Sequence, residues 1–240
     1  RYLDRHFDKL NPRTAIREIP AGIIKAEKAL VFIGINMAIF ITATYFINTI
    51  CFYLSPVALF VILFYSYTKR FTALCHLILG LGLALAPIGA YLAVSGEFNI
   101  IPLFFSAAVL FWVSGFDIIY SLQDEEFDKT HKLHSIPVLL GKKNALMLSN
   151  ILHLLTFSAL SIAGSLGEFS LYYWIGFWSF SALLVYQHTL VKHNDLSKVN
   201  LAFFTTNGIA SLIFGAFVIA DLLIKSAVNL SSANSGIFKC

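Results

Sequence analysis

Long runs of apolar residues, separated by short polar segments, follow one another along most of the chain. Each run is about 20 residues long, which is the length that an α-helix needs to cross the hydrocarbon core of a bilayer. The runs do not alternate apolar with polar residues, as membrane-spanning β-strands do. Because lipid offers no partner to exposed backbone amides, we expect all of the runs to be helical. The sequence therefore predicts seven spans, at residues 29 to 48, 52 to 68, 71 to 94, 101 to 120, 144 to 165, 170 to 190 and 201 to 224.

The composition supports this interpretation. Of the 240 residues, 58% are hydrophobic and only 12% are charged, whereas about a quarter of the residues of a soluble domain are charged. The three cysteines show no CxxC spacing, so neither a disulfide framework nor a zinc site is expected. We predict an all-α, multi-pass transmembrane bundle, folded as a single domain over residues 1–240, with a disordered tail over 226–240.

Basic residues mark alternate loops of the predicted bundle. Of the 17 Lys and Arg residues, seven lie in 1 to 28, two at 69 to 70, four in 121 to 143 and two in 191 to 200. The loops between these segments have none, and the last two cations follow the final span. The positive-inside rule then places the first residues in the cytoplasm and the C-terminus outside. A nucleic-acid-binding protein would gather its cations on one soluble face, so no nucleic acid is expected as a partner.

The acidic residues are few, and most of them fall into two clusters. Seven of the 13 carboxylates lie in the segments RYLDRHFD and DIIYSLQDEEFD. Each cluster holds two aspartates four residues apart, Asp4 and Asp8 in the first and Asp124 and Asp128 in the second. This spacing places both members of a pair on one helical face.

Asp117 and Tyr120 precede the second pair at spacings that extend it into one helical stripe. Asp117 falls inside the predicted span 101 to 120, where an isolated carboxylate is costly. We therefore expect Asp117 to face a cavity that is lined by protein or filled with water.

Basic residues accompany both acidic clusters. Arg13 and Arg17 follow the first cluster, and Lys132 follows the second. Both runs continue into Ile-Pro and then Gly, so the chain contains a degenerate internal repeat of DxxxD, bases, Ile-Pro and Gly. Lys69 and Arg70 end another predicted span on the same side of the membrane.

Acids and bases in this arrangement are suited to a metal and a phosphate. Like carboxylates on adjacent helical turns repel each other, and a divalent cation would compensate them. Mg²⁺ is commonly held by one or two carboxylates together with waters and phosphate oxygens. Arginine binds a diphosphate through two parallel hydrogen bonds and lysine binds it as a point charge. The alternative is a set of solvated helix ends whose cations only follow the positive-inside rule, but this does not explain why the acids accompany them.

At these residues the sequence resembles the UbiA family of intramembrane prenyltransferases. The family's first signature, NxxxDxxxD with spaced arginines, is similar to 1–22, and its second, DxxYxxxDxxxD with Ser-x-Pro and Gly downstream, to 117–141. The matching residues are Asp4, Asp8, Arg13 and Arg17, then Asp117, Tyr120, Asp124, Asp128, Ser135, Pro137 and Gly141, with YTKR at 67–70 as a third element. The family usually has nine helices, so the resemblance implies an N-terminal truncation, with one helix, most of a second and the signature Asn lying before Arg1.

The resemblance also implies an activity. Family members transfer a polyisoprenyl chain from its diphosphate to an acceptor, commonly an aromatic ring that becomes a quinone. We expect this chain to be such an enzyme in the bacterial inner membrane, with its site on the cytoplasmic side. The implied roles are Mg²⁺ binding by Asp4, Asp8, Asp124 and Asp128, diphosphate binding by Arg13, Arg17, Lys69, Arg70 and Lys132, and orientation or deprotonation of the acceptor by Asp117 and Tyr120.

The acceptor and the protein class both have alternatives. A 4-hydroxybenzoate acceptor, as in ubiquinone biosynthesis, needs a cation for its carboxylate, yet between Arg70 and Lys129 only His76 could supply one. A naphthoate precursor of menaquinone is the second candidate. A transporter is the rival class, since internal repeats and intramembrane acids occur there. Its acids would lie near the bilayer midplane, whereas only Asp117 and Asp221 fall inside predicted spans.

Overall fold

The computed structural model describes residues 1–237, and it describes side chains as far as Val228. Six helical segments in this part are long and apolar enough to cross a membrane. They are carried by α2 (Ala26–Ile47), α3 (Thr49–Thr68), α4 (Cys75–Ser95), α5 (Ile100–Ser121), α7 (Ile136–Leu166) and α9 (Asn207–Ile237). The described chain has no β-strand, and the expected multi-pass helical bundle is confirmed.

The sixth predicted span, 170 to 190, forms α8 (Leu171–Leu190), but α8 is not among the six segments that are apolar enough. Tyrosine, tryptophan and the polar pair Gln187 and His188 lower its hydropathy. These polar groups face the protein, since the fully buried Gln187 donates a hydrogen bond from Nε2 to the Ala202 carbonyl, 3.1 Å away. Helix α8 therefore belongs to the bundle through packing against α9.

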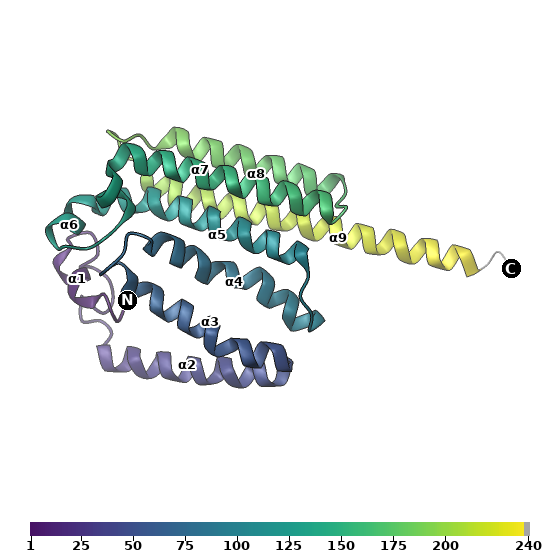
Figure 1. Ribbon diagram of the computed structural model, residues 1–240, viewed down its shortest axis with the longest axis horizontal. Coiled ribbons are helices and arrows are strands. Elements are labelled where there is room, and N and C mark those ends of the chain that lie inside the picture. The colour runs from purple at the N-terminus through teal and green to yellow at the C-terminus, as the bar shows by residue number, and fades with distance from the viewer. Residues whose placement is uncertain (238–240) are drawn as a thin grey trace.

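Helix α5 lies at the centre of the bundle, with α4 packed on one side and α7 on the other. Helix α3 packs on α4, and α2 packs on α3 (Figure 1). The close approach of α4 and α5 depends on Gly80, where a Cβ atom would collide with Ser114 Oγ and the Leu110 carbonyl. This contact fixes the spacing of the two helices directly behind the candidate site.

Two short helices, α1 (Arg5–Leu10) and α6 (Glu125–Thr130), lie together at one end of the bundle (Figure 1). They come from the segments that carry the two acidic clusters, which are far apart in the sequence. Figure 1 also places the start of α7 at this end, so the basic segments 1 to 28 and 121 to 143 share it. This arrangement agrees with the alternation of basic loops.

The last helix continues beyond the position where the sequence predicts a disordered tail. Helix α9 passes residue 226 and reaches Ile237, and this stretch contains no proline that would end a helix. Residues 238–240, and the side chains after Val228, lie outside the described part of the chain.

Candidate functional site

The two DxxxD motifs adopt the same local structure. Asp4 directly precedes α1 and Asp124 directly precedes α6, and both helices have six residues. The backbone angles agree closely, with φ −92° and ψ 2° at Asp4 and φ −100° and ψ 2° at Asp124. Neither side chain caps its helix, although aspartate is a favoured capping residue, so both carboxylates are free for other partners. The internal repeat is therefore present in three dimensions.

The second cluster does not form one continuous helical stripe, which corrects the prediction from spacing. Helix α5 ends at Ser121, a 3₁₀ turn follows over Leu122–Asp124, and α6 then begins. Three consecutive carboxylates at 124–126 explain the break, because acids are stabilised in the first turn of a helix and not in its interior. The new helix start brings Asp124 and Asp128 to the same cavity as Asp117.

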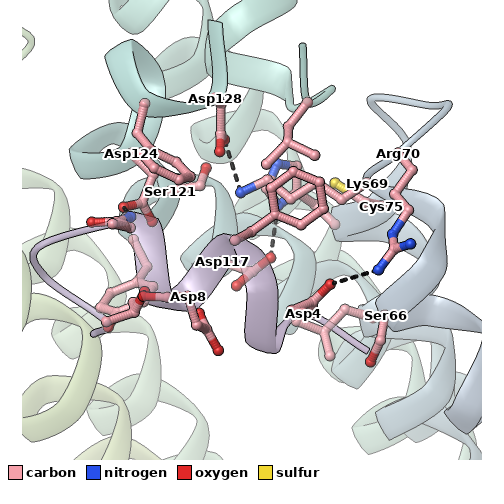
Figure 2. Close-up of a pocket in the computed structure, with 18 of the residues that line it drawn as sticks. Asp4, Asp8, Ser66, Lys69, Arg70, Cys75, Asp117, Ser121, Asp124 and Asp128 are labelled. Carbon is pink, nitrogen blue, oxygen red and sulfur yellow. Dashed lines mark hydrogen bonds and ion pairs between the residues drawn. The ribbon is translucent and has the colours of Figure 1, made fainter. Parts of the chain in front are cut away.

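A cavity of about 250 Å³ opens between α1, α6 and the ends of α3, α4 and α5. Figure 2 shows the labelled aspartates of the two motifs approaching it from two sides, with Asp117 between them. Its lining includes ten of the eleven residues implied as site residues: Asp4, Asp8, Arg13, Arg17, Lys69, Arg70, Asp117, Tyr120, Asp124 and Asp128.

Lys132 is the exception. It is exposed and does not line the cavity, whereas its neighbour Leu133 does. The backbone at Lys132 has a φ of 54°, in the left-handed region, as the chain turns after α6. This turn leaves Lys132 at the surface, outside the cavity lining, and its contact with a diphosphate stays a prediction.

Arg13 joins the two motifs across the cavity. Its Nε lies 3.0 Å from Asp124 Oδ1, and Nη2 contacts Asp124 Oδ2, which gives the two parallel hydrogen bonds that arginine makes to a carboxylate. Its Nη1 donates to the Tyr120 hydroxyl at 2.6 Å. Asn11 donates from Nδ2 to Asp124 Oδ1 at 3.0 Å, so Asp124 is held from two sides. The guanidinium of Arg13 keeps its charge, because the hydrogen bonds and charge of Asp124 outweigh burial and raise its pKa.

The other three motif aspartates each face one cation. Arg17 Nη1 lies 2.7 Å from Asp8 Oδ1, and Lys69 Nζ lies 2.8 Å from Asp128 Oδ2. Arg70 and Asp4 form a looser pair, with 3.8 Å between Nη2 and Oδ1. Burial raises the pKa of the Asp4 carboxyl above its ordinary value.

Several polar atoms at the cavity remain without partners. Asp8 Oδ2 and Asp128 Oδ1 are buried and accept no hydrogen bond, and Arg70 Nε is buried and donates none. Unpaired buried polar atoms are costly, so these positions are suited to a ligand that supplies both a cation and an anion. Within the described residues no three His, Cys, Asp or Glu side chains converge tightly enough to hold a metal by themselves. Mg²⁺ does not require this, because it commonly takes one or two carboxylates and completes its shell with water and phosphate.

The charges of the lining lead to the same conclusion. Five aspartates and four Lys or Arg side chains line the cavity, so the lining has one net negative charge when His76 is neutral. A diphosphate would add several negative charges in a partly buried space. Such binding requires additional positive charge, and a divalent cation would supply it.

Sequence reasoning missed some of the residues that shape the site. Asn11 has no motif that predicts its contact with Asp124, and only its position directly after α1 could have indicated it. Phe203 stacks on Tyr120 with 4.1 Å between ring centroids. It belongs to a π-helical turn, Leu201–Thr206, and such turns are frequent at functional sites.

Comparisons with known proteins find a matching family and several relatives. A model described as the UbiA prenyltransferase family matches residues 1–220. The chain is 30% identical over 219 residues to a 4-hydroxybenzoate octaprenyltransferase of Tolumonas auensis, covering 91% of this chain and 76% of the relative. The corresponding protein of Francisella tularensis subsp. tularensis is 32% identical over 223 residues, covering 92% and 76%.

Two solved structures share the arrangement of helices. An apo UbiA homolog from Aeropyrum pernix K1 superposes with a TM-score of 0.83 at 31% identity, covering 91% of this chain and 81% of the other. A digeranylgeranylglyceryl phosphate synthase in membranes superposes with a TM-score of 0.68 at 22% identity, covering 91% and 77%. The second likeness shows the fold alone.

Proposed function

This chain belongs to the UbiA prenyltransferase family, and from that premise we propose that it transfers a polyisoprenyl group from its diphosphate to an aromatic acceptor in quinone biosynthesis. One observation carries the proposal. Four motif aspartates and four cations converge on one cavity, and within it carboxylate oxygens of Asp8 and Asp128 and the Nε atom of Arg70 lack partners. The names of the curated relatives support an aromatic acceptor.

Mg²⁺ is part of the proposal, with Asp4, Asp8, Asp124 and Asp128 as the residues that would hold it. The bound metal would neutralise the diphosphate and so stabilise the charge that develops on the leaving group. In the structure each of these aspartates faces a cation instead. When a diphosphate binds, the cations would turn to its oxygens, and the carboxylates would then be free to hold the metal.

Arg13, Arg17, Lys69 and Arg70 bind the diphosphate in this mechanism. The C–O bond between the prenyl chain and the diphosphate breaks, and the diphosphate takes the electron pair. Cations placed around the leaving group favour this step, because they stabilise charge that is larger in the transition state than in the ground state. The allylic cation must be kept from water, and neighbouring aromatic rings would stabilise it by cation–π contact.

Asp117 and Tyr120 act on the acceptor. A ring carbon of the acceptor attacks the allylic carbon, a C–C bond forms, and the proton of that ring carbon leaves to restore aromaticity. The transfer therefore releases one proton and one diphosphate for each acceptor prenylated. Asp117 has its Oδ2 engaged by His76, and its partly exposed side chain lines the cavity, so its other oxygen is placed to orient the acceptor or to take a proton.

The acceptor proposed first is a hydroxybenzoate, because the curated relatives carry that name. Its carboxylate needs a cationic partner in the cavity, as does that of a hydroxynaphthoate, the second candidate acceptor. Between Arg70 and Lys129 the sequence offers only His76 as a cation for this carboxylate, but its Nδ1 already bonds Asp117 and its Nε2 accepts a hydrogen bond from the Ile136 amide. An acceptor carboxylate must therefore reach one of the four cations nearer the diphosphate site.

A transporter is disfavoured by the use that the fold makes of Asp221. This fully buried carboxylate accepts hydrogen bonds from the Ser170 amide at 3.0 Å, the Tyr173 amide at 3.1 Å and the Ser170 hydroxyl. It therefore satisfies the first amides of α8, which would otherwise lack acceptors. An acid held in this way has a structural role and is poorly suited to carry ions.

We propose a bacterial inner-membrane location with the cavity on the cytoplasmic side. The chain is an integral membrane protein, and the end that holds the cavity also gathers the basic segments 1 to 28 and 121 to 143. Positively charged loops favour the cytoplasmic side.

Binding of substrate can be tested by thermal unfolding of the full-length protein in lipid nanodiscs. A prenyl diphosphate and Mg²⁺ together should raise the Tm, and neither alone should do so to the same extent. Asp128→Asn should abolish the joint effect. Glu126→Gln is the matched control, because Glu126 belongs to the same acidic run but is exposed and does not line the cavity. A Tm that ignores the two ligands, as expected of a transporter, would contradict the proposal.

A further inference from the structure

His76 lies on α4 and lines the cavity, and it is almost completely buried at 2% exposure. Its Nδ1 is 2.6 Å from Asp117 Oδ2, on the neighbouring helix α5. Figure 2 marks this contact by the dashed line from Asp117. The cavity surface near the proposed acceptor position therefore includes a pair of side chains and not an isolated carboxylate.

The contact made by the second ring nitrogen of His76, Nε2, shows which ring nitrogen carries the proton. The backbone amide of Ile136, at the start of α7, lies 3.3 Å from His76 Nε2. A backbone N–H can only donate, so Nε2 must accept with its lone pair. The proton of the neutral ring is then on Nδ1, which donates to Asp117. The backbone carbonyl of His76 also accepts a hydrogen bond from Ser114 Oγ at 3.2 Å, which anchors the residue to α5.

This geometry leaves Asp117 with two different oxygens. Oδ2 is bound by a donor that is fixed on both sides, so the carboxylate rotamer is fixed as well. Among the described residues no hydrogen bond to Oδ1 is found, and the Asp117 side chain keeps 22% of its surface exposed where it lines the cavity. Because the Asp117 carboxylate is held through Oδ2, its Oδ1 is presented in one fixed direction.

We propose that His76 is a positioning residue for the transfer reaction: it holds Asp117 so that Oδ1 accepts a hydrogen bond from the hydroxyl of a phenolic or naphtholic acceptor. This proposal deepens the proposed function and rests on it. In this arrangement Asp117 recognises the acceptor hydroxyl at the deep end of the cavity. The acceptor carboxylate then points toward the four cations at the diphosphate end.

His76 also makes a contact that supports the start of α7, and this role can be separated from its contact with Asp117. The Ile136 amide belongs to the first turn of α7 and has no partner within the helix, so His76 Nε2 satisfies it. Loss of this contact would disturb the start of α7 without any change at Asp117. Loss of the Nδ1 contact would release Asp117 and leave α7 intact.

Two variants of similar shape each keep one of the two His76 contacts and lose the other. The amide nitrogen of asparagine takes the place of the histidine Nδ1, so His76→Asn keeps a donor for Asp117 and loses the acceptor for Ile136. Glutamine reaches the place of Nε2, so His76→Gln keeps a partner for Ile136 and loses the donor for Asp117. His134→Gln is the control, because His134 is exposed and does not line the cavity.

Steady-state transfer by the full-length protein in membranes is measured for each variant. We expect His76→Gln to lower kcat by about 10- to 100-fold, the size usual for loss of a residue that orients a functional group. The KM for the prenyl diphosphate should stay unchanged, and His76→Asn and His134→Gln should retain most of the wild-type kcat. Wild-type kcat in His76→Gln would overturn the proposal. Equal losses in His76→Asn and His76→Gln at equal Tm would also overturn it.

A measurement without turnover separates this inference from the proposed function. If the wild-type protein prenylates no acceptor, the proposed function fails, and the His76 pair is still tested by ¹⁵N NMR of labelled histidine. The His76 signals, assigned by their loss in His76→Gln, should show a protonated Nδ1 and an unprotonated Nε2. They should shift in Asp117→Leu. An unprotonated Nδ1 would contradict the arrangement.

Discussion

Lys69 is the position where the charge arrangement of the cavity can be perturbed with a calculable result. Its Nζ lies 2.8 Å from Asp128 Oδ2, and the Asp128 side chain is only 1% exposed. Lys69→Met keeps the length of the side chain and removes its charge, so a buried carboxylate is left without compensation. The free energy of unfolding should fall.

The size of the effect follows from burial. Loss of one partner of a fully buried ion pair costs about 3–5 kcal/mol. The Lys69 side chain is 33% exposed, so water relieves part of this cost and the expected loss is about 2–4 kcal/mol. For a chain of this length that corresponds to a fall in Tm of roughly 5–15 °C. If Asp128 binds Mg²⁺, the metal should restore a large part of the loss, since it compensates the same carboxylate.

The assay is thermal unfolding in nanodiscs with and without millimolar Mg²⁺. Lys69→Met/Asp128→Asn should be more stable than Lys69→Met alone, because the uncompensated charge is removed. Lys129→Met is the matched control: Lys129 pairs with Glu125 one helical turn away, its side chain is 54% exposed, and its loss should cost only about 0.5 kcal/mol. The reasoning is refuted if Lys69→Met unfolds at the wild-type Tm, or if neither Mg²⁺ nor the second substitution improves its stability.

Four further outcomes are expected. Arg13→Lys removes the paired donors that Arg13 directs at Asp124 in this structure and that we propose turn to the diphosphate; it should lower kcat/KM by roughly 10- to 100-fold in a labelled-prenyl transfer assay, because charge-assisted hydrogen bonds contribute about 1.5–3 kcal/mol. Asp221→Ala removes the acceptor for the first amides of α8 and should cost about 1–3 kcal/mol of stability by thermal unfolding, with an unchanged KM for prenyl diphosphate. Asp4→Asn should raise the Tm at neutral pH, since burial raises the pKa of Asp4 and its charged form therefore opposes folding; this advantage should fade as the pH falls through the raised pKa and vanish below 3.8, where wild-type Asp4 is protonated in both the folded and the unfolded state. Asp117→Asn should slow turnover of the acceptor, and an unchanged kcat would remove Asp117 from the mechanism.

The parts of the site that could be predicted from the sequence are those set by local spacing. Asp4 with Asp8, and Asp124 with Asp128, are four residues apart, and each pair falls on one short helix start because one helical turn brings such residues together. The long apolar runs fixed the helices in the same way, since the thickness of the bilayer sets their length. Pattern alone therefore predicted the bundle and the convergence of the acids on one side.

The parts that could not be predicted depend on contacts between distant segments. Asn11 bonds Asp124 across 113 residues and His76 bonds Asp117 across 41, and no local pattern encodes either pair. Lys132 matched the expected spacing but lies at the surface, because a left-handed turn after α6 decides its direction. The helix break after Ser121 likewise follows from competition between an apolar run that continues a helix and an acidic run that starts a new one.

The most direct test of the proposed activity is formation of a prenylated product. Membranes that contain the full-length protein are incubated with Mg²⁺, a labelled prenyl diphosphate and a panel of hydroxybenzoate and hydroxynaphthoate acceptors, with Asp124→Asn as the control variant. We predict a labelled product with at least one acceptor, no product after removal of Mg²⁺ by a chelator, and a strongly reduced yield with the variant. Absence of product with every acceptor, or equal yields from Asp124→Asn and wild type, would contradict prenyl transfer at this cavity.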